Sequence, residues 1–67
     1  MATKLRRARE REGQSRAALA RLAGVSERTL RRAEDGEAIS EVTKGKILKG
    51  FHKVPDRLRD YSYGDLF

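Results

Sequence analysis

Arginine side chains are the groups in this sequence whose type and spacing best fit a chemical task. Arg28, Arg31 and Arg32 stand close together between Ser26 and Asp35. A guanidinium is a planar, permanently charged fork that can donate two hydrogen bonds at once to a phosphate or to a base edge. This grouping suggests recognition of a polyanion.

The overall charge points to the same class of partner. The chain has 16 Lys and Arg against 10 Asp and Glu, a net charge of +6 at pH 7, which favours nucleic acid or an acidic membrane surface. Residues 1–33 hold ten basic residues against three acidic ones, and residues 34–67 hold six against seven. We therefore expect the electrostatic footprint in the first half, although a merely solvated charged surface stays open as an alternative.

Other kinds of site lack the residues they need. The chain has no cysteine and a single histidine, His52, which argues against a disulfide framework or a Cys/His zinc site. No catalytic triad, metal cluster or phosphate loop is visible, so we expect no enzymatic activity, metal or cofactor. No apolar run approaches the roughly 18 residues of a membrane span, and Met1 to Leu5 lack the core of a secretory signal, so a cytoplasmic protein is expected.

The elements that must position the arginines read as short helices. Ser15, Ser26 and Ser40 are N-cap candidates, and Gly13, Gly24 and Gly36 stand where helices should end. The predicted helices span residues 4–12, 15–23, 26–35 and 40–52, and residues 62–67 form a closing turn after an irregular connection. Strand signals are absent. The sequence predicts one all-α domain, residues 1–67, with four or five helices.

The second and third predicted helices match a helix-turn-helix, because only Gly24-Val25-Ser26 separates them. Small alanines at positions 20 and 23 let the helices approach, and Val25 and Leu30 fill the wedge between them. At 100° per residue the third helix has two faces. Its inner face holds Ser26, Thr29, Leu30 and Ala33, and its outer face holds Glu27, Arg28, Arg31, Arg32 and Asp35.

The fourth predicted helix also has two sides. Its inward side is expected to hold Thr43, Ile47, Leu48 and Phe51, and Gly45 and Gly50 weaken the prediction of a helix here. Its opposite side holds Lys46, Lys49 and Lys53. For these lysines, as for Arg6, Arg7 and Arg11, a solvated surface and a phosphate contact are both open, with the solvated surface favoured.

Residues Gln14 to Gly36 resemble the helix-turn-helix of the Cro and lambda-repressor (XRE-like) family. The resemblance covers Leu5 to about Phe51, and residues 63–67 resemble that family's closing fifth helix. Its motifs here are Leu19-Ala20, Gly24-Val25-Ser26, Thr29-Leu30 and Glu34-Asp35-Gly36. The family's glutamate-containing capping box is missing after Ser15, and the stretch 55–61 is longer than its usual link.

The resemblance implies roles for residues of the third helix. Glu27, Arg28 and Arg32 would reach base edges in the major groove, with Arg31 on the same face. Arginine can donate two hydrogen bonds to guanine, whereas Glu27 either accepts from cytosine or holds Arg31 in a salt bridge, the slightly favoured alternative.

The resemblance also implies contacts outside the major groove. An ion pair is expected between Arg9 and Glu34. Phosphate contacts are expected from Arg16, where the family usually has glutamine, from Ser26 and Lys44, and less surely from Ser40.

These features predict sequence-specific binding of duplex DNA by a transcriptional regulator. The resemblance implies a repressor that is encoded by a phage or another mobile element. The protein would work in the cytoplasm, on the nucleoid when bound. A homodimer would read an inverted repeat with half-sites about 34 Å apart. The alternative is an antitoxin-like protein-interaction module that also autoregulates its own operon through the same helix-turn-helix. The C-terminal aromatic and apolar residues, Tyr61, Tyr63, Leu66 and Phe67, either pack on the core or form a dimer contact.

Overall fold

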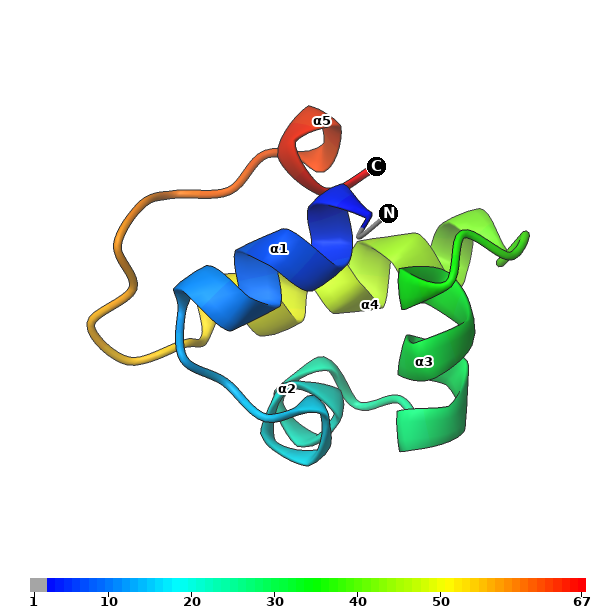
Figure 1. Cartoon of the computed structure of the whole chain (residues 1–67), viewed down its shortest axis with the longest axis horizontal. Helices are drawn as coiled ribbons and strands as arrows, with labels where there is room; N and C mark the ends of the chain where they lie inside the picture. Colours follow the sequence, from blue (N-terminus) through cyan, green and yellow to red (C-terminus); the bar gives the residue numbers. More distant parts are fainter. Residues whose placement is uncertain (1–2) are drawn as a thin grey trace.

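The computed structural model describes residues 3–67, and in this part of the chain it has five α-helices and no strand (Figure 1). The helices are α1 Lys4–Arg11, α2 Arg16–Ala23, α3 Glu27–Glu34, α4 Glu41–His52 and α5 Tyr63–Leu66. The expected all-α class is confirmed, with five helices rather than four. Met1 and Ala2, on which part of the signal-peptide argument rests, lie outside the described residues.

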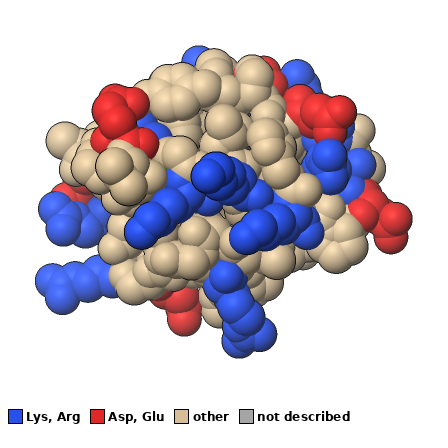
Figure 2. Space-filling model, turned by 180° about the vertical axis from the view of Figure 1, so that it is seen from behind, with Lys and Arg blue, Asp and Glu red and all other residues tan. Residues whose placement is uncertain are grey.

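The helices pack around one another through a small set of interfaces. The α2 helix contacts α3 and α4, and α1 contacts α3 and α5. The α3 helix lies at one edge of the molecule, and the connection after α4 runs around the opposite edge to α5 (Figure 1). Seen from the side on which α4 lies, lysine and arginine side chains gather across the middle of the surface (Figure 2).

Hydroxyl side chains begin the first four helices. Thr3, Ser15, Ser26 and Ser40 each accept a hydrogen bond from the backbone N–H three residues later. This contact satisfies a donor that has no partner inside the helix. At the other end of α2, Gly24 adopts φ 72°, a left-handed conformation that glycine reaches without a Cβ clash. The observed helix ends lie within one or two residues of the predicted ones.

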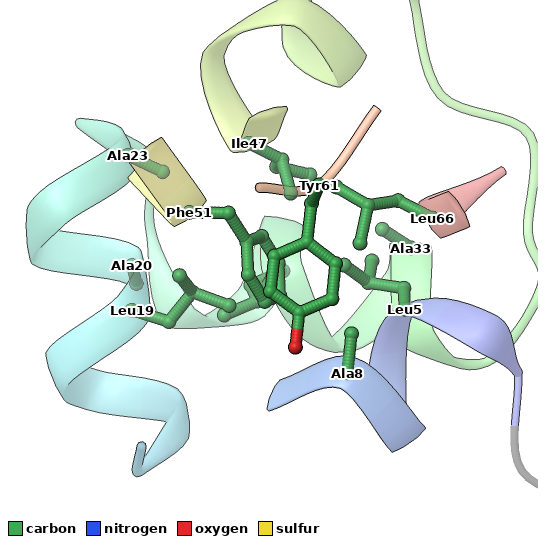
Figure 3. Close-up of a cluster of buried hydrophobic side chains, with 11 residues drawn as sticks. Leu5, Ala8, Leu19, Ala20, Ala23, Ala33, Ile47, Phe51, Tyr61 and Leu66 are labelled. Carbon is green, nitrogen blue, oxygen red and sulfur yellow. The ribbon is translucent and has the colours of Figure 1, made fainter. Parts of the chain in front are cut away.

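The core is built from leucine, alanine and aromatic side chains of all five helices and the last connection (Figure 3). Phe51 and Tyr61 stack at its centre, with ring centroids 5.0 Å apart and planes tilted by 56°. Leu5, Leu19 and Leu30 are fully buried around them. Each apolar side chain of this size contributes about 1.5–3 kcal/mol through its burial.

Close approach of α2 and α4 depends on Gly50, which is buried. A Cβ atom at this position would lie 2.7 Å from the Cβ of Ala23 and 2.8 Å from its Cα. Real Cβ atoms do not approach that closely, so only glycine fits without a shift of α2. The residue that weakened the sequence-based prediction of this helix is therefore required by its packing.

The long connection between α4 and α5 is held by a carboxylate at the end of α1. Glu12 accepts hydrogen bonds from the backbone N–H of Leu58, at 2.9 and 3.1 Å, and from the hydroxyl of Tyr61, at 2.6 Å. Burial, together with the Glu12 contact, raises the pKa of Tyr61. His52 contacts the Tyr61 carbonyl oxygen at 2.8 Å through Nε2. These contacts fix the connection that precedes α5.

The C-terminal residues divide between core and surface. Tyr61 and Leu66 are each 2 % exposed and belong to the core, whereas Tyr63 is 43 % exposed. Phe67 is half-buried against the core and packs against Tyr63 with ring centroids 5.3 Å apart. Packing on the core thus accounts for Tyr61 and Leu66 fully and for Phe67 in part, and leaves Tyr63 at the surface.

Candidate nucleic-acid interface

A tight turn joins the α2 and α3 helices. The backbone N–H of Val25 donates to the Ala20 carbonyl at 3.0 Å, which closes α2. Ser26 then opens α3 by accepting from the backbone N–H of Thr29 at 3.1 Å. Leu30 is 0 % exposed, so α3 is anchored in the core by its second turn.

The outer face of α3 carries all four residues expected to read bases. Glu27, Arg28, Arg31 and Arg32 are exposed, while Leu30, Ala33 and Glu34 on the other side are buried. The three arginines line an open groove together with Asp35 and Glu37. The arrangement can therefore present several hydrogen-bond donors to one elongated ligand surface.

The charge of this face is nearly balanced. Arg32 Nε lies 3.5 Å from Glu37 Oε1, and both side chains are about half exposed. Three arginines on the exposed side of this segment meet three acidic residues, which are Glu27, Asp35 and Glu37. The positive charge counted for residues 1–33 therefore gives little net charge on this face, because Asp35 and Glu37 share the surface of the arginines.

A second expectation about this face is wrong. Within residues 3–67 no ion pair joins Glu27 and Arg31, although their i,i+4 spacing allows one. An exposed pair of this kind gains only about 0.3–0.5 kcal/mol, so its absence costs α3 little stability. Glu27 remains an exposed acceptor near the start of α3.

Behind α3, the carboxylate of Glu34 joins three helices. Its side chain is 1 % exposed and lies 2.6 Å from Arg9 Nε, with a second contact of 3.2 Å from Arg9 Nη2. Arg16 Nε approaches the same carboxylate at 3.4 Å. Removal of one partner from a buried pair costs about 3–5 kcal/mol, since the other charge is left without compensation. The pair fixes α3 relative to α1 and α2.

Arg16 is the most exposed of the three residues Arg9, Arg16 and Glu34. Its side chain is 35 % exposed, compared with 11 % for Arg9. The Nη atoms of Arg16 make no hydrogen bond to any other residue in the range 3–67. Its guanidinium is thus oriented by Glu34 while its donors remain available at the start of α2.

The two serines expected to contact phosphate are engaged in local contacts. The Ser26 hydroxyl serves as the α3 cap and also donates to Thr29 Oγ1 at 2.9 Å. Ser40 has the same arrangement with Thr43.

Lys44 is held against α5 by aromatic and acidic neighbours. Its Nζ lies 6.0 and 5.7 Å from the ring centroids of Tyr63 and Phe67, and 3.4 Å from Glu41 Oε1. Hydrogen bonding with the Tyr63 side chain is the main cause that raises the pKa of Lys44. Cation–π contacts of this kind are worth about 0.5–1 kcal/mol at exposed sites. Lys44 therefore has a structural contact that the sequence did not indicate.

Sequence-based prediction missed the roles of several residues around the site. Thr3 caps α1 and donates to the Glu34 carbonyl at 2.9 Å, and a threonine directly before a helical run is a signal that could have revealed it. Glu37 lies five residues after its partner Arg32, a spacing with no helical meaning beyond the end of α3. Glu12 gave no signal, because its partners lie 46 and 49 positions further along the chain.

No helix among the described residues is long and apolar enough to cross a membrane. Within the same residues, no group of three or more His, Cys, Asp or Glu side chains could hold a metal ion.

Comparison with known proteins gives one match. A protein-family model described as a helix-turn-helix domain matches residues 1–60, which include α1 to α4 and most of the connection after α4. No curated protein and no solved structure matches the chain.

Proposed function

We propose, from the premise that the chain belongs to the helix-turn-helix domain family, that it binds duplex DNA sequence-specifically and regulates transcription. The observation that carries the proposal is the division of α3 into two faces. Leu30, Ala33 and Glu34 hold the helix in the core, and every long polar side chain of its other face is exposed. A helix held in this way can enter a major groove without unfolding any of its support.

In this proposal the exposed residues of α3 read base edges. Arg28 and Arg32 each donate two hydrogen bonds to guanine O6 and N7, with Arg31 between them. Glu27, which has no ion pair with Arg31, accepts from cytosine N4. A bidentate contact gives about 1–3 kcal/mol of discrimination against the wrong base, so each half-site contains at least one G·C pair.

Residues outside this face would position the protein on the phosphates. Arg16 is the strongest of them, because Glu34 orients its guanidinium while the Nη donors stay available. Ser26 would add a hydroxyl at the start of α3. Lys44 would reach a phosphate from the start of α4 by moving its ammonium away from the rings of Tyr63 and Phe67.

The finer part of the proposal rests on the resemblance to the Cro and lambda-repressor (XRE-like) group. It makes the protein a cytoplasmic repressor of a phage or mobile element, with residues 1–67 acting as one DNA-binding unit. A homodimer would occupy an inverted repeat whose half-sites are about 34 Å apart.

Selection of bound sites from a random DNA pool, followed by competition at fixed salt between selected and random duplexes, tests this function. We expect one enriched motif that contains G·C pairs and, for a homodimer, inverted symmetry. Equal affinity for all duplexes would refute sequence-specific regulation.

Two variants then separate the proposed roles. Arg32→Ala should relax the base preference, whereas Arg16→Ala should weaken binding to all duplexes alike and flatten the salt dependence. Because Arg16 also contacts Glu34, thermal unfolding is measured for both variants, and binding is compared well below their Tm. Identical changes in base preference for the two variants would contradict this division.

A further inference from the structure

Two lysines of α4 and the lysine that caps its C-terminal end form an exposed row, which we call the α4 lysine row. Lys46, Lys49 and Lys53 are all exposed, and at 100° per residue they fall within an arc of about 60° on the helix. The first and last lie seven positions apart, which corresponds to roughly 10 Å along the helix axis. Lysine and arginine side chains gather over this helix in the view from the α4 side (Figure 2).

No carboxylate neutralises the row. Glu41 is the only acidic residue of α4, and it is occupied by Lys44 and by the hydroxyl of Tyr63, at 3.4 and 3.0 Å. Among residues 3–67, none of the row's three lysines takes part in an ion pair. The row therefore carries three uncompensated charges in a small area.

This contrasts with the face of α3. There, three exposed arginines meet three exposed acidic residues, and Arg32 is paired with Glu37. A face with so little net charge gives weak long-range attraction to DNA, although its arginines can discriminate bases at contact. The segment from Glu41 to Lys53, by contrast, has four lysines against one glutamate. The attraction must come from surfaces other than α3.

We propose that the α4 lysine row is a second phosphate-binding surface, which contacts the DNA backbone outside the groove occupied by α3. The inference rests on the proposed DNA-binding function. Duplex DNA carries one charge per about 1.7 Å of its axis, so a row of this length meets several phosphates at once. Ammonium groups on flexible stems suit contacts that do not depend on sequence. The row would supply affinity and salt dependence, and α3 would supply base preference.

The test replaces Lys46, Lys49 and Lys53 together by glutamine and measures affinity for a selected duplex over a range of salt concentrations. The slope of log K against log salt is negative, and each lost phosphate contact makes it less steep by about 0.9. We expect the slope to become less steep by about 2 to 3, while the preference for the selected site over random DNA is retained.

A matched control removes the same charge from another helix. Arg6, Arg7 and Arg11 are exposed on α1, and their joint replacement by glutamine changes the net charge equally. We expect a smaller change of slope in this control. Equal slopes for the two triple variants, or an unchanged slope in the lysine variant, would overturn the proposal.

Further arms identify which DNA the row contacts. A reduced slope on a duplex that covers only the α3 site supports contact with the same duplex. If two differently labelled duplexes show energy transfer with the parent protein and lose it with the triple lysine variant, the row contacts a second duplex. If the triple lysine variant does not fold, each single substitution should lower the slope by about 0.9, and the triple Lys→Arg variant should preserve it. Loss of base preference in the lysine variant without a change of slope would overturn this proposal and also refute the base-reading role given to α3.

Discussion

Replacement of Gly50 by alanine tests the close approach of α2 and α4. The added methyl group would lie 2.7 Å from the Cβ of Ala23, 2.8 Å from its Cα and 2.9 Å from its backbone N. Two of these three atoms belong to the backbone, so no rotation of a side chain can relieve the contact. The α2 helix must move, and with it the turn that leads into α3.

The expected size of the effect follows from two opposing contributions. Overpacking of a core costs about 1–3 kcal/mol, and the backbone contacts place Gly50→Ala towards the upper end. The better helix propensity of alanine offsets about 1 kcal/mol of this loss of stability. We therefore expect a net loss of about 2 kcal/mol in the free energy of unfolding, which lowers the Tm by about 8–16 °C in a domain of this size.

The same helix offers a matched control. A Cβ at Gly45 would meet nothing within 4 Å, so Gly45→Ala gains the helix propensity without a clash. We expect it to stabilise the protein by about 0.5–1 kcal/mol. Thermal and urea unfolding of the two variants, followed by circular dichroism, should give shifts of opposite sign for an identical chemical change.

A double variant examines the cause of the loss. Ala23→Gly removes only one of the three close atoms, so Ala23→Gly combined with Gly50→Ala should recover little of the stability. If Gly50→Ala were as stable as the parent protein, or if the double variant were fully restored, the backbone contact would not be the reason for glycine at position 50.

Three further predictions concern other parts of the chain. Tyr61→Phe removes a buried hydroxyl that donates to Glu12 at 2.6 Å, and urea unfolding should show a loss of about 1–2 kcal/mol. Hydrogen bonds from Ser62 lower the pKa of Asp65 below 3.8. The stability that Asp65 gives to the fold is therefore complete above the unfolded-state pKa and is lost as the pH falls through the lower folded-state pKa. An NMR titration should show this carboxyl titrating below 3.8, with α5 loosening at the same pH. Glu37→Gln should release Arg32, which lies 3.5 Å from it, and tighten DNA binding several-fold in a titration at low salt; weaker binding would mean that the pair positions this arginine.

The helices could be predicted from the sequence because their ends depend on nearby residues. Ser15, Ser26 and Ser40 each contact a backbone N–H only three positions away. The two faces of α3 follow from the same local periodicity, and the structure has Leu30 and Ala33 buried as predicted.

The contacts that escaped prediction join distant segments or depend on atomic distances. Nothing near Glu12 indicates that it binds Leu58 and Tyr61, and nothing near Lys44 indicates that it lies over aromatic rings. The need for Gly50 appears only when Ala23 is in place. The functional roles of the exposed arginines stay predictions, since they depend on a ligand surface outside the chain.

The separation of the two faces of α3 has a consequence for engineering. Positions 27, 28, 31 and 32 are exposed, and the ion pairs in which these residues take part lie at the surface. A combinatorial library at these four positions would therefore vary the DNA-facing chemistry while every variant inherits the same anchored helix. Such a library could yield a set of small binders with different target sequences and nearly equal melting temperatures.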